Sequence, residues 1–184
     1  QQLPEMVGMT VPTAIFSAAN YSAAVYHGLT AGAAGLIATF GDQAMKDVYL
    51  PKMLSGEWQG TMALTEPQAG SSLSDIAAMA TAAPQGYYNI KGQKIFISAG
   101  DHDGVDNVVH LALARVKDAP AGVKGISLFI IPKKRICEDG SLEPNDVNCA
   151  GVYHKLGYRG APITQLAFGE NEDCRGWLVG EANQ

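Results

Sequence analysis

The chain has 184 residues, of which 47% are hydrophobic and 17% are charged, and its formal net charge is −5 with a pI near 5.3. This is the composition of a globular protein, long enough for one large domain or parts of two. A nucleic-acid-binding surface normally shows a basic stripe, so the acidic balance argues against a nucleic-acid partner.

The three cysteines, Cys137, Cys149 and Cys174, are widely separated, and the chain has neither a CxxC pair nor a secretory signal pattern. This usage favours free thiols in a reducing compartment over a disulfide framework. We therefore expect a cytoplasmic protein. The chain begins with Gln rather than Met, and a new segment starts at Val179 just before its end, so we interpret it as a piece of a longer protein.

The first third of the chain has a helical pattern. No charged residue occurs from Val11 to Gly41, and about 20 apolar residues can span a bilayer. Polar residues interrupt this stretch, however, and alanine dominates over leucine and isoleucine, so we expect buried helices and no membrane span. The pattern predicts one helix with Pro12 in its opening turn and its end at Gly28, then a second helix over Ala31–Thr39.

Asp42 is typical of a helix N-cap, and Met45 and Tyr49 follow it at helical spacing until Ser55-Gly56 ends the segment. From Trp58 onward the hydrophobic period changes to two, which is typical of strands separated by turn residues. The predicted strands are Gln59–Thr65, Ala77–Ala83, Tyr87–Lys91, Lys94–Ser98, Asn107–Val116, Ile126–Pro132, Gly151–Leu156, Ile163–Phe168 and Trp177–Val179.

These elements predict an α+β fold. A short all-helical part over residues 1–57 precedes an antiparallel β-barrel or sandwich domain over residues 58–184. Between two of the predicted strands, residues 133–148 are expected to form a charged loop with a tight turn at Asp139-Gly140.

Two stretches of the β-rich part predict a ligand site. In the first, the strand-like run that includes Met62 and Leu64 stops at Thr65-Glu66-Pro67, and the small-residue turn Ala69-Gly70-Ser71-Ser72 follows. Pro67 pushes the residue before it into an extended conformation. Gly70 can take a backbone shape that other residues resist and lets a ligand approach the main chain. A strand end followed by such a turn suits a flat cofactor with a phosphate tail.

The second stretch runs from Asn89 to Gly100 and contains the predicted strand Lys94–Ser98. Side chains on a strand alternate between its two faces, so Ile95 and Ile97 are expected on one face and Lys94, Phe96 and Ser98 on the other. An aromatic ring and a hydroxyl two residues apart can both reach one flat ligand, the ring by stacking and the hydroxyl by hydrogen bonding.

The two stretches together resemble the acyl-CoA dehydrogenases, whose usual form is close to TEPxAGSD followed by NGxKxWITNG. The resemblance covers nearly the whole chain, including the run from Leu50 to Glu57 and Lys155-Leu156-Gly157-Tyr158-Arg159-Gly160. Three residues depart from that form: Phe96 stands for the usual Trp, Ser98 for Thr and Ser72 for Asp. The following Ser-Ala-Gly-Asp-His-Asp run is similar to the longer bacterial members, which include the methylmercaptopropionyl-CoA enzymes.

The resemblance implies that the β-domain binds one side of FAD. The residues it assigns to the flavin are Met62, Leu64, Thr65, Gly70, Ser71, Phe96, Ile97 and Ser98. Within that set it places Ser71 near the acyl-CoA as well and the Ser98 hydroxyl near flavin N5. It also offers Tyr21, Val25 and Leu29 as a wall of the acyl-chain pocket, with ordinary core packing as the alternative for each.

The implied reaction is α,β-dehydrogenation of an acyl-CoA thioester to a trans-2-enoyl-CoA, with hydride transfer to FAD N5. The thioester α-proton is a very weak acid, so hydrogen bonds to the carbonyl and a desolvated site must assist its removal. The family's base is a Glu in a carboxy-terminal helical bundle, which we expect beyond Gln184, and no Glu of this chain matches it. Glu66 is expected to be structural. The resemblance further implies electron-transferring flavoprotein as the electron acceptor and a homodimer or homotetramer.

Other interpretations stay open at this point. An acyl-CoA oxidase, a flavin monooxygenase of the same fold and a non-catalytic flavin- or CoA-binding module would share these residues, whereas a β-sandwich interaction domain would bind no flavin. Asp101-His102-Asp103 resembles a metal cluster, but adjacent loop residues rarely complete a coordination shell, and we expect no metal. The chain has no GxGxxG or P-loop motif, which argues against nicotinamide and nucleotide-triphosphate sites.

Overall fold

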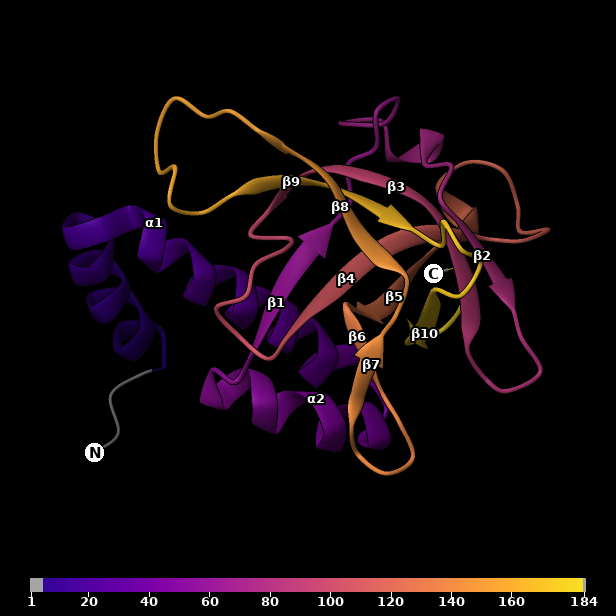
Figure 1. The fold of residues 1–184 in the computed structure, drawn as a ribbon, viewed down its shortest axis with the longest axis horizontal. Coiled ribbons are helices and arrows are strands. Elements are labelled where there is room, and N and C mark those ends of the chain that lie inside the picture. The colour runs from indigo at the N-terminus through magenta and orange to yellow at the C-terminus, as the bar shows by residue number, and fades with distance from the viewer. Residues whose placement is uncertain (1–4, 184) are drawn as a thin grey trace.

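The computed structural model describes residues 5–183, in which two α-helices precede ten strands that form an eight-stranded sheet and a separate two-stranded sheet (Figure 1). The two helices are α1 (Glu5–Phe40) and α2 (Gln43–Ser55). The outer limits of the two predicted domains, at residues 1 and 184, lie outside the described residues. The α+β class expected from the sequence is confirmed.

Helix α1 is one element where two were predicted. It bends at Asn20, whose backbone is non-helical at φ −159° and ψ 96°, and the Asn20 Oδ1 atom caps the second half by accepting from Ala23 N at 3.2 Å. The helix does not end at Gly28, because the surrounding alanines have high helix propensity and carry it through. Pro12 lies inside the helix rather than in its opening turn.

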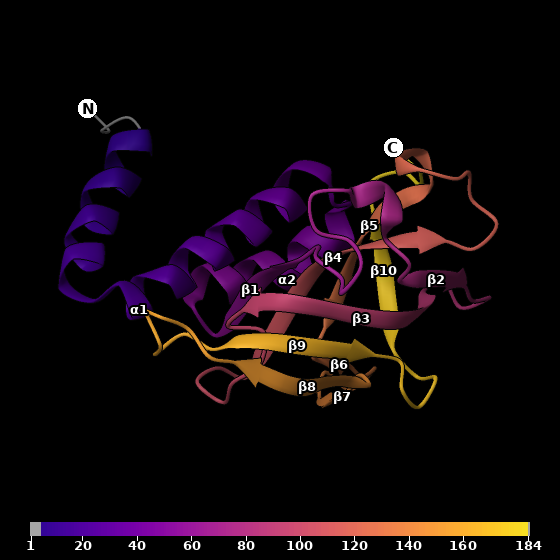
Figure 2. The same ribbon diagram turned by 90° about the horizontal axis from the view of Figure 1, so that it is seen from above.

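The segment Thr10–Phe40 of α1 is long and apolar enough to cross a membrane by length and composition. In its most apolar stretch of 18 residues, 17% of the residues are buried inside the protein. One such helix is weak support for a span, since the core helix of a soluble protein passes the same test. The amino-terminal part of α1 projects away from the sheet, as Figure 2 shows. The expectation that α1 does not span a membrane therefore stays a prediction.

Helix α2 has the ends that the sequence predicts. Asp42 accepts a hydrogen bond from Met45 N at 2.8 Å, which satisfies a free amide of the first turn. Gly56 adopts the left-handed conformation at φ 84° and donates from its amide to Met53 O at 3.3 Å. Trp58 then begins the first strand two residues later.

The strands are β1 (Trp58–Ala63), β2 (Met79–Ala82), β3 (Tyr88–Ser98), β4 (Asn107–Val116), β5 (Ile126–Pro132), β6 (Lys134–Ile136), β7 (Leu142–Pro144), β8 (Val147–Tyr153), β9 (Ile163–Phe168) and β10 (Arg175–Val179). Their order in the main sheet is β1-β4-β5-β10-β3-β9-β8, with β2 beside β3 and β4. The end strands β1 and β8 do not pair, so the sheet is open and sandwich-like rather than a closed barrel. Most pairs are antiparallel, but β4 pairs with β1 and β2 in parallel.

The sheet folds over on itself and creates two cores. The first core lies inside the fold of the sheet and includes Ile90, Ala112, Phe129 and Phe168, from β3, β4, β5 and β9. The second core lies between the sheet and the helices and includes Ile37, Tyr49, Met53, Leu111 and Ile130. Figure 2 shows the resulting layers, with α1 and α2 on one side and β9 and β8 on the other.

Helix α1 approaches the sheet most closely at Gly60 in β1. A Cβ atom at this position would lie 2.5 Å from the Cβ of Ala33 and 2.7 Å from the terminal methyl of Met53. The Gly60 amide also donates to Thr30 Oγ1 at 3.2 Å. The missing side chain therefore allows the helix to lie directly on the strand that carries the first predicted motif.

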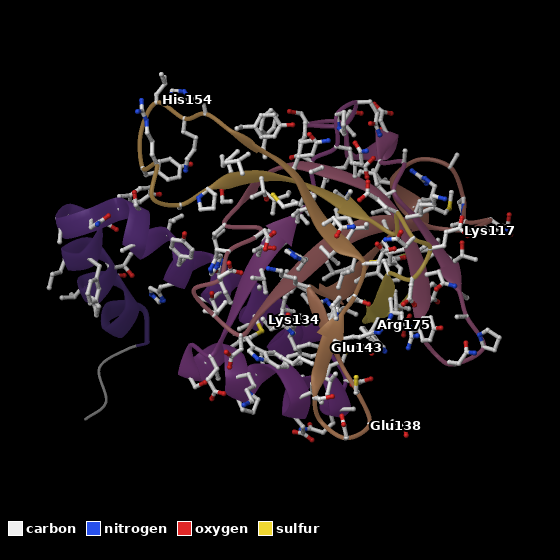
Figure 3. All side chains as sticks on the ribbon, viewed as in Figure 1. Lys117, Lys134, Glu138, Glu143, His154 and Arg175 are labelled. Atoms are coloured by element: carbon white, nitrogen blue, oxygen red, sulfur yellow. The ribbon has the colours of Figure 1, made fainter. Side chains whose placement is uncertain are left out.

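Two predictions about the strands were wrong. The strands predicted over Tyr87–Lys91 and Lys94–Ser98 are one strand, because Gly92 at φ 158° keeps the chain extended between them. The loop predicted over residues 133–148 contains the β6–β7 hairpin. Polar residues hold this hairpin: Arg135 donates to Glu143 Oε1 at 2.5 Å and to Asp173 Oδ2 at 2.7 Å. Figure 3 shows Glu143 on the hairpin and Glu138 at its tip.

Candidate functional site

The two stretches singled out in the sequence lie side by side. Beyond Ala63 the chain leaves its partner β4, and Thr65 O accepts a hydrogen bond from Ile95 N of β3 at 2.9 Å. The strand end with its small-residue turn and the strand with its aromatic residue therefore share one short junction, as the sequence suggested.

A buried ion pair holds this junction together. The side chains of Glu66 and Lys94 are 3% and 1% exposed, and Lys94 Nζ donates to Glu66 Oε1 at 2.8 Å. Lys94 Nζ also donates to Leu64 O at 3.0 Å. The Glu66 carboxylate accepts from the amides of Ala77 at 2.7 Å and Ala78 at 3.0 Å. The expectation that Glu66 is structural is confirmed.

The electrostatics of the pair follow from burial and hydrogen bonding. Burial alone raises the pKa of the Glu66 carboxyl, but the hydrogen bonds from Lys94 and the two backbone amides outweigh it, so the pKa lies below its ordinary value. Burial lowers the pKa of the Lys94 amine, and the carboxylate of Glu66 only partly offsets this. A carboxylate held in its charged form by a buried cation is a poor general base, because it has little tendency to take up a proton.

Strand β3 has a bulge at the centre of the predicted aromatic motif. Phe96 adopts a left-handed conformation at φ 58°, and the register with β9 shifts between Lys94 and Ile97. A bulge inserts one residue into a strand and reverses the alternation of faces after it. Lys94 and Ile97 are therefore both buried, whereas Phe96 is 55% exposed.

The predicted alternation of side chains was consequently wrong in part. Lys94 does not share a face with Phe96 and Ser98, and Ile95 does not share one with Ile97. Phe96 and Ser98, both beyond the inserted residue, keep a common face that points away from the first core. Phe96 and Ser98, the two residues expected to contact a flat ligand, therefore still share a face. The simple period of two did not predict the bulge that produces this arrangement.

The turn after the first motif is compact. Glu66 N and Ala69 O are joined by a hydrogen bond of 2.9 Å, and Ala69 N donates to Glu66 O at 3.1 Å. Gly70 and Ser71 follow and are exposed. Gly70 does not have a positive φ, and a Cβ there would meet nothing within 4 Å, so the chain itself does not require a glycine at this position. The backbone at Gly70 remains open to close approach by another molecule.

Three hydroxyl groups in these two stretches have no hydrogen-bond partner among the described residues. Within residues 5–183, the side chains of Thr65, Ser71 and Ser98 make no hydrogen bond, although Thr65 and Ser98 are half-buried. The alternative role for Thr65 and Ser98, ordinary strand residues engaged in hairpin contacts, would occupy these groups. Their hydroxyls are instead available to a ligand.

The remaining residues of the predicted set differ in what they offer. Met62 packs partly against the second core, and Leu64 is half-buried with its carbonyl held by Lys94. The Ile97 side chain lies in the first core and its carbonyl accepts from Thr164 Oγ1 at 3.0 Å. Ile97 can therefore meet a ligand only through its main chain.

The sequence did not identify Tyr153 as a residue near the site, and it indicated the wrong face for Lys94. Tyr153 of β8 lies against the ring of Phe96, with the ring centroids 4.8 Å apart. Lys94 was placed on the ligand face, whereas it acts from inside. Lys94 is a lysine within a strand, and Glu66 lies at a strand end 28 positions earlier in the chain. This pattern is only a weak signal of a buried ion pair, because the two residues come together only in the fold.

A separate pocket of about 790 Å³ lies at the opposite end of β1. Its lining includes Tyr26, Thr30, Met53, Gln59 and His102. None of the residues predicted to contact the flavin lines it. The suggested acyl-chain wall of Tyr21, Val25 and Leu29 does not line it either.

The Asp101-His102-Asp103 run lies beside this pocket. Lys133 forms ion pairs with Asp101 and, at 3.9 Å, with Asp103. His102 hydrogen-bonds to Gln59 through Nε2 and accepts from Gly104 N at 3.1 Å through Nδ1. The run is therefore tied into the local protein structure, with a lysine between its two carboxylates.

The loop between β8 and β9, which includes the Lys155–Gly160 run, is held in place by contacts within the loop and by one contact with helix α1. Lys155 Nζ lies 3.3 Å from the centroid of the Tyr158 ring, and Arg159 donates to Lys155 O at 2.9 Å. Tyr26 of α1 donates its hydroxyl to Gly160 O at 3.0 Å, which joins the loop to the helix. Figure 3 shows His154 at the outer edge of this loop.

Comparison with known proteins agrees with this arrangement. Residues 61–170 match the model of the acyl-CoA dehydrogenase middle domain. A butyryl-CoA dehydrogenase from Syntrophomonas wolfei is 46% identical over 168 residues, which cover 90% of this chain and 27% of that protein. A 3-methylmercaptopropionyl-CoA dehydrogenase from Ruegeria pomeroyi is 44% identical over 182 residues, or 98% of this chain and 30% of that protein.

Among solved structures, an acyl-CoA dehydrogenase complexed with FAD from Bacillus anthracis has a TM-score of 0.73 and 26% identity, covering 92% of this chain and 26% of the other. The chain thus spans less than a third of the length of these relatives. On the match to the middle-domain model and the identity to these enzymes, the chain belongs to the acyl-CoA dehydrogenase family.

Proposed function

We propose that this chain forms one half of the FAD and acyl-CoA site of an acyl-CoA dehydrogenase, which converts an acyl-CoA thioester to a trans-2-enoyl-CoA. The observation that carries the proposal is the hydrogen bond from Ile95 N to Thr65 O, which joins the strand that carries the exposed Phe96 ring and the free Ser98 hydroxyl to the chain that carries the free Thr65 hydroxyl. Family membership supports the reaction class, and the identity to butyryl-CoA and methylmercaptopropionyl-CoA dehydrogenases supports a short acyl-CoA as substrate.

The residues at the junction fit a flat, polar-edged cofactor. Phe96 offers an exposed aromatic face, and Thr65 and Ser98 offer hydroxyls without protein partners among the described residues. Gly70 and Ser71 offer an open backbone and a hydroxyl near the end of the turn. We assign these residues, together with Met62, Leu64 and the main chain of Ile97, to FAD, and Ser71 also to the acyl-CoA.

When bound, FAD supplies the acceptor for the hydride that leaves the β-carbon of the acyl group. The chain's own contribution is position and electrostatics. Thr65 and Ser98 donate hydrogen bonds to the cofactor edge, and Phe96 and Tyr153 exclude water from one side. No carboxylate of this chain is assigned as the base, because Glu66 is buried in an ion pair.

The wider setting of the enzyme is proposed on family membership alone. We infer a helical part over residues 1–57 and a middle β-domain over residues 58–184, a homodimer or homotetramer, and a cytoplasmic location. Electron-transferring flavoprotein is the proposed electron acceptor. The proposal includes neither a membrane span nor a nucleic-acid partner.

Anaerobic titration of the intact enzyme that contains this chain tests the function. We expect acyl-CoAs of short chain length to bleach the visible absorbance of bound flavin, with enoyl-CoA as the product. Bound flavin that no acyl-CoA reduces would contradict the dehydrogenase and favour a non-catalytic module. Rapid reoxidation of the reduced flavin by oxygen would favour the oxidase or monooxygenase instead.

A change at Phe96 separates the cofactor contact from the fold. We expect Phe96→Gly to weaken FAD binding about tenfold, since an aromatic contact contributes about 0.5–1.5 kcal/mol beyond area burial and 1.4 kcal/mol corresponds to tenfold. The free energy of unfolding should change by less than about 1 kcal/mol, because glycine relieves the left-handed conformation while it loosens the unfolded chain. Equilibrium dialysis and denaturation of the apoprotein measure the two effects.

The matched variant Phe96→Trp keeps an aromatic ring at the same place and is expected to bind FAD within about threefold of the original, a difference of well under 1.4 kcal/mol. If Phe96→Gly bound FAD as tightly as Phe96→Trp, the ring would have no part in the cofactor site.

A further inference from the structure

Lys94 stands out because it contacts both halves of the proposed flavin site from inside the protein. It lies two residues before the bulge at Phe96, and its side chain is 1% exposed. From β3 its ammonium group reaches across to the chain that follows β1, where it donates to Leu64 O at 3.0 Å and to Glu66 Oε1 at 2.8 Å. The two residues on either side of Thr65 are thus held by one cation.

We propose that Lys94 is a positioning residue of the flavin site. Its ammonium group fixes the main chain at Leu64 and Thr65 relative to the bulge at Phe96, and so sets the geometry in which the Thr65 and Ser98 hydroxyls meet the cofactor. The inference rests on the proposed function, since it concerns how this chain holds FAD.

The contact with Leu64 is the part of this arrangement that positions the site. Leu64 lies just beyond β1, where the regular ladder with β4 has ended at Ala63. Ile95 N holds the next carbonyl, that of Thr65, at 2.9 Å. Two consecutive carbonyls are therefore held from β3, one by a backbone amide and one by a charged side chain. A hydrogen bond from a charged group is stronger than one between neutral groups.

Glu66 holds the ammonium group in place. Its carboxylate accepts from the amides of Ala77 and Ala78 as well as from Lys94, and Gln68 Nε2 donates to its Oε2 atom at 2.7 Å. These contacts fix the side-chain conformation of Glu66. Ala77 and Ala78, just before β2, therefore contact Glu66. Glu66 contacts Lys94, and Lys94 contacts the carbonyl of Leu64.

A purely structural ion pair would behave differently. Replacing both members of a buried ion pair by neutral residues is often nearly neutral for stability, whereas removing one member leaves an unpaired charge. A double variant that removes both charges therefore keeps the fold while it removes the hydrogen bond to Leu64. Glu66→Gln alone removes the negative charge but leaves the Lys94 amine beside Leu64.

The test compares FAD binding in four forms of the intact flavoenzyme: the original, Glu66→Gln, Glu66→Gln with Lys94→Met, and Lys91→Met. Lys91 is the matched control, because it lies on the same strand and its ion pair with Glu172 is exposed on the surface. The original enzyme must bind FAD and be reduced by acyl-CoA; if it is not, the proposed function fails and the positioning role fails with it. Apoprotein melting temperature, FAD dissociation constant and the flavin reduction potential are measured for each form.

We expect Lys91→Met to bind FAD within about threefold of the original, a difference of well under 1.4 kcal/mol, whereas Glu66→Gln should melt at a lower temperature because the Lys94 charge is left unpaired. The double variant should bind FAD about tenfold more weakly than the original, as expected for the loss of one charge-assisted hydrogen bond, with a shifted reduction potential and a melting temperature close to that of the original. Equal FAD affinity and potential in the double variant and in the original would overturn the proposal when the original enzyme is active. So would a lower melting temperature with unchanged affinity in the folded protein, because the pair would then serve stability alone.

Discussion

Replacing Gly169 by alanine is expected to lower the free energy of unfolding by about 2–5 kcal/mol. Gly169 follows β9 with a left-handed backbone at φ 72°, and a Cβ atom there would lie 2.2 Å from the carbonyl oxygen of Ile90. Left-handed backbone costs a side-chain-bearing residue about 1–2 kcal/mol. Overpacking adds about 1–3 kcal/mol, and here the obstacle is the main chain of β3, which cannot rotate aside.

Gly86→Ala is the matched control for this prediction. Gly86 also has a left-handed backbone, at φ 86°, but a Cβ there would meet nothing within 4 Å. Its variant should therefore lose only the conformational cost of about 1–2 kcal/mol. Denaturant unfolding of the two variants under identical conditions measures the difference. If both lost the same amount, the approach between the turn at Gly169 and β3 would not be as tight as described.

Acidification from pH 7 to pH 5 is expected to reduce the free energy of unfolding by about 2 kcal/mol through His110 alone. His110 of β4 is fully buried, and its Nδ1 atom shares a hydrogen bond of 2.7 Å with Thr61 Oγ1. Among the described residues its Nε2 atom has no hydrogen-bond partner. Burial lowers the pKa of His110 to about 3; the nearby Asp101 opposes this shift, and Lys133 adds to it.

The sign follows from proton linkage. In the unfolded chain His110 takes up a proton below its ordinary pKa of about 6.5, whereas in the folded protein it stays neutral until about pH 3. The unfolded state therefore binds more protons between these values, and stability falls as the pH falls through that window. The pKa of Glu66 also lies below its ordinary value, but its contribution is lost only below about pH 4.3. Burial also lowers the pKa of His102, so His102 adds to the loss between pH 6.5 and 5, and the difference between the original protein and a His110 variant isolates the part due to His110.

The variant His110→Gln should show a flatter profile of unfolding free energy between pH 7 and 5. His154→Gln serves as its control, because the side chain of His154 is exposed on the outer loop and stays in contact with water in both states. A His110→Gln protein that lost as much stability on acidification as the original would rule out His110 as the source. Denaturant titrations at several pH values provide the measurement.

Most of the strands could be predicted because their apolar residues face a core. Asn107–Val116, Ile126–Pro132 and Ile163–Phe168 have the predicted bounds, since each supplies residues to the first core. The β6–β7 hairpin was missed because it is held mainly by ion pairs of Arg135, one across the hairpin to Glu143 and one to Asp173 in the loop before β10. A hydrophobic period carries no information about such a pair.

The site could be predicted as a set of residues but not as a geometry. The motif identified Thr65, Phe96 and Ser98, and the structure brings their strands together through the hydrogen bond from Ile95. The placement of Lys94 and Phe96 on opposite faces depends on the bulge, which depends in turn on pairing with β9 from far along the chain. No local pattern shows that one residue of β3 is inserted out of register.

The position of β10 has a consequence for biosynthesis. This strand is the last of the described strands, yet it lies between β5 and β3 in the interior of the sheet (Figure 1). After Pro132, the end of β5, a ribosome adds 47 residues to reach Val179, which takes roughly 2–9 s at about 5–20 residues per second. Until then β5 and part of β3 present unpaired edges, the kind of surface that pairs with other chains. The nascent protein therefore passes through an interval in which these edges can pair with other chains, and a chain that stops before Arg175 would leave the edge of β5 unpaired.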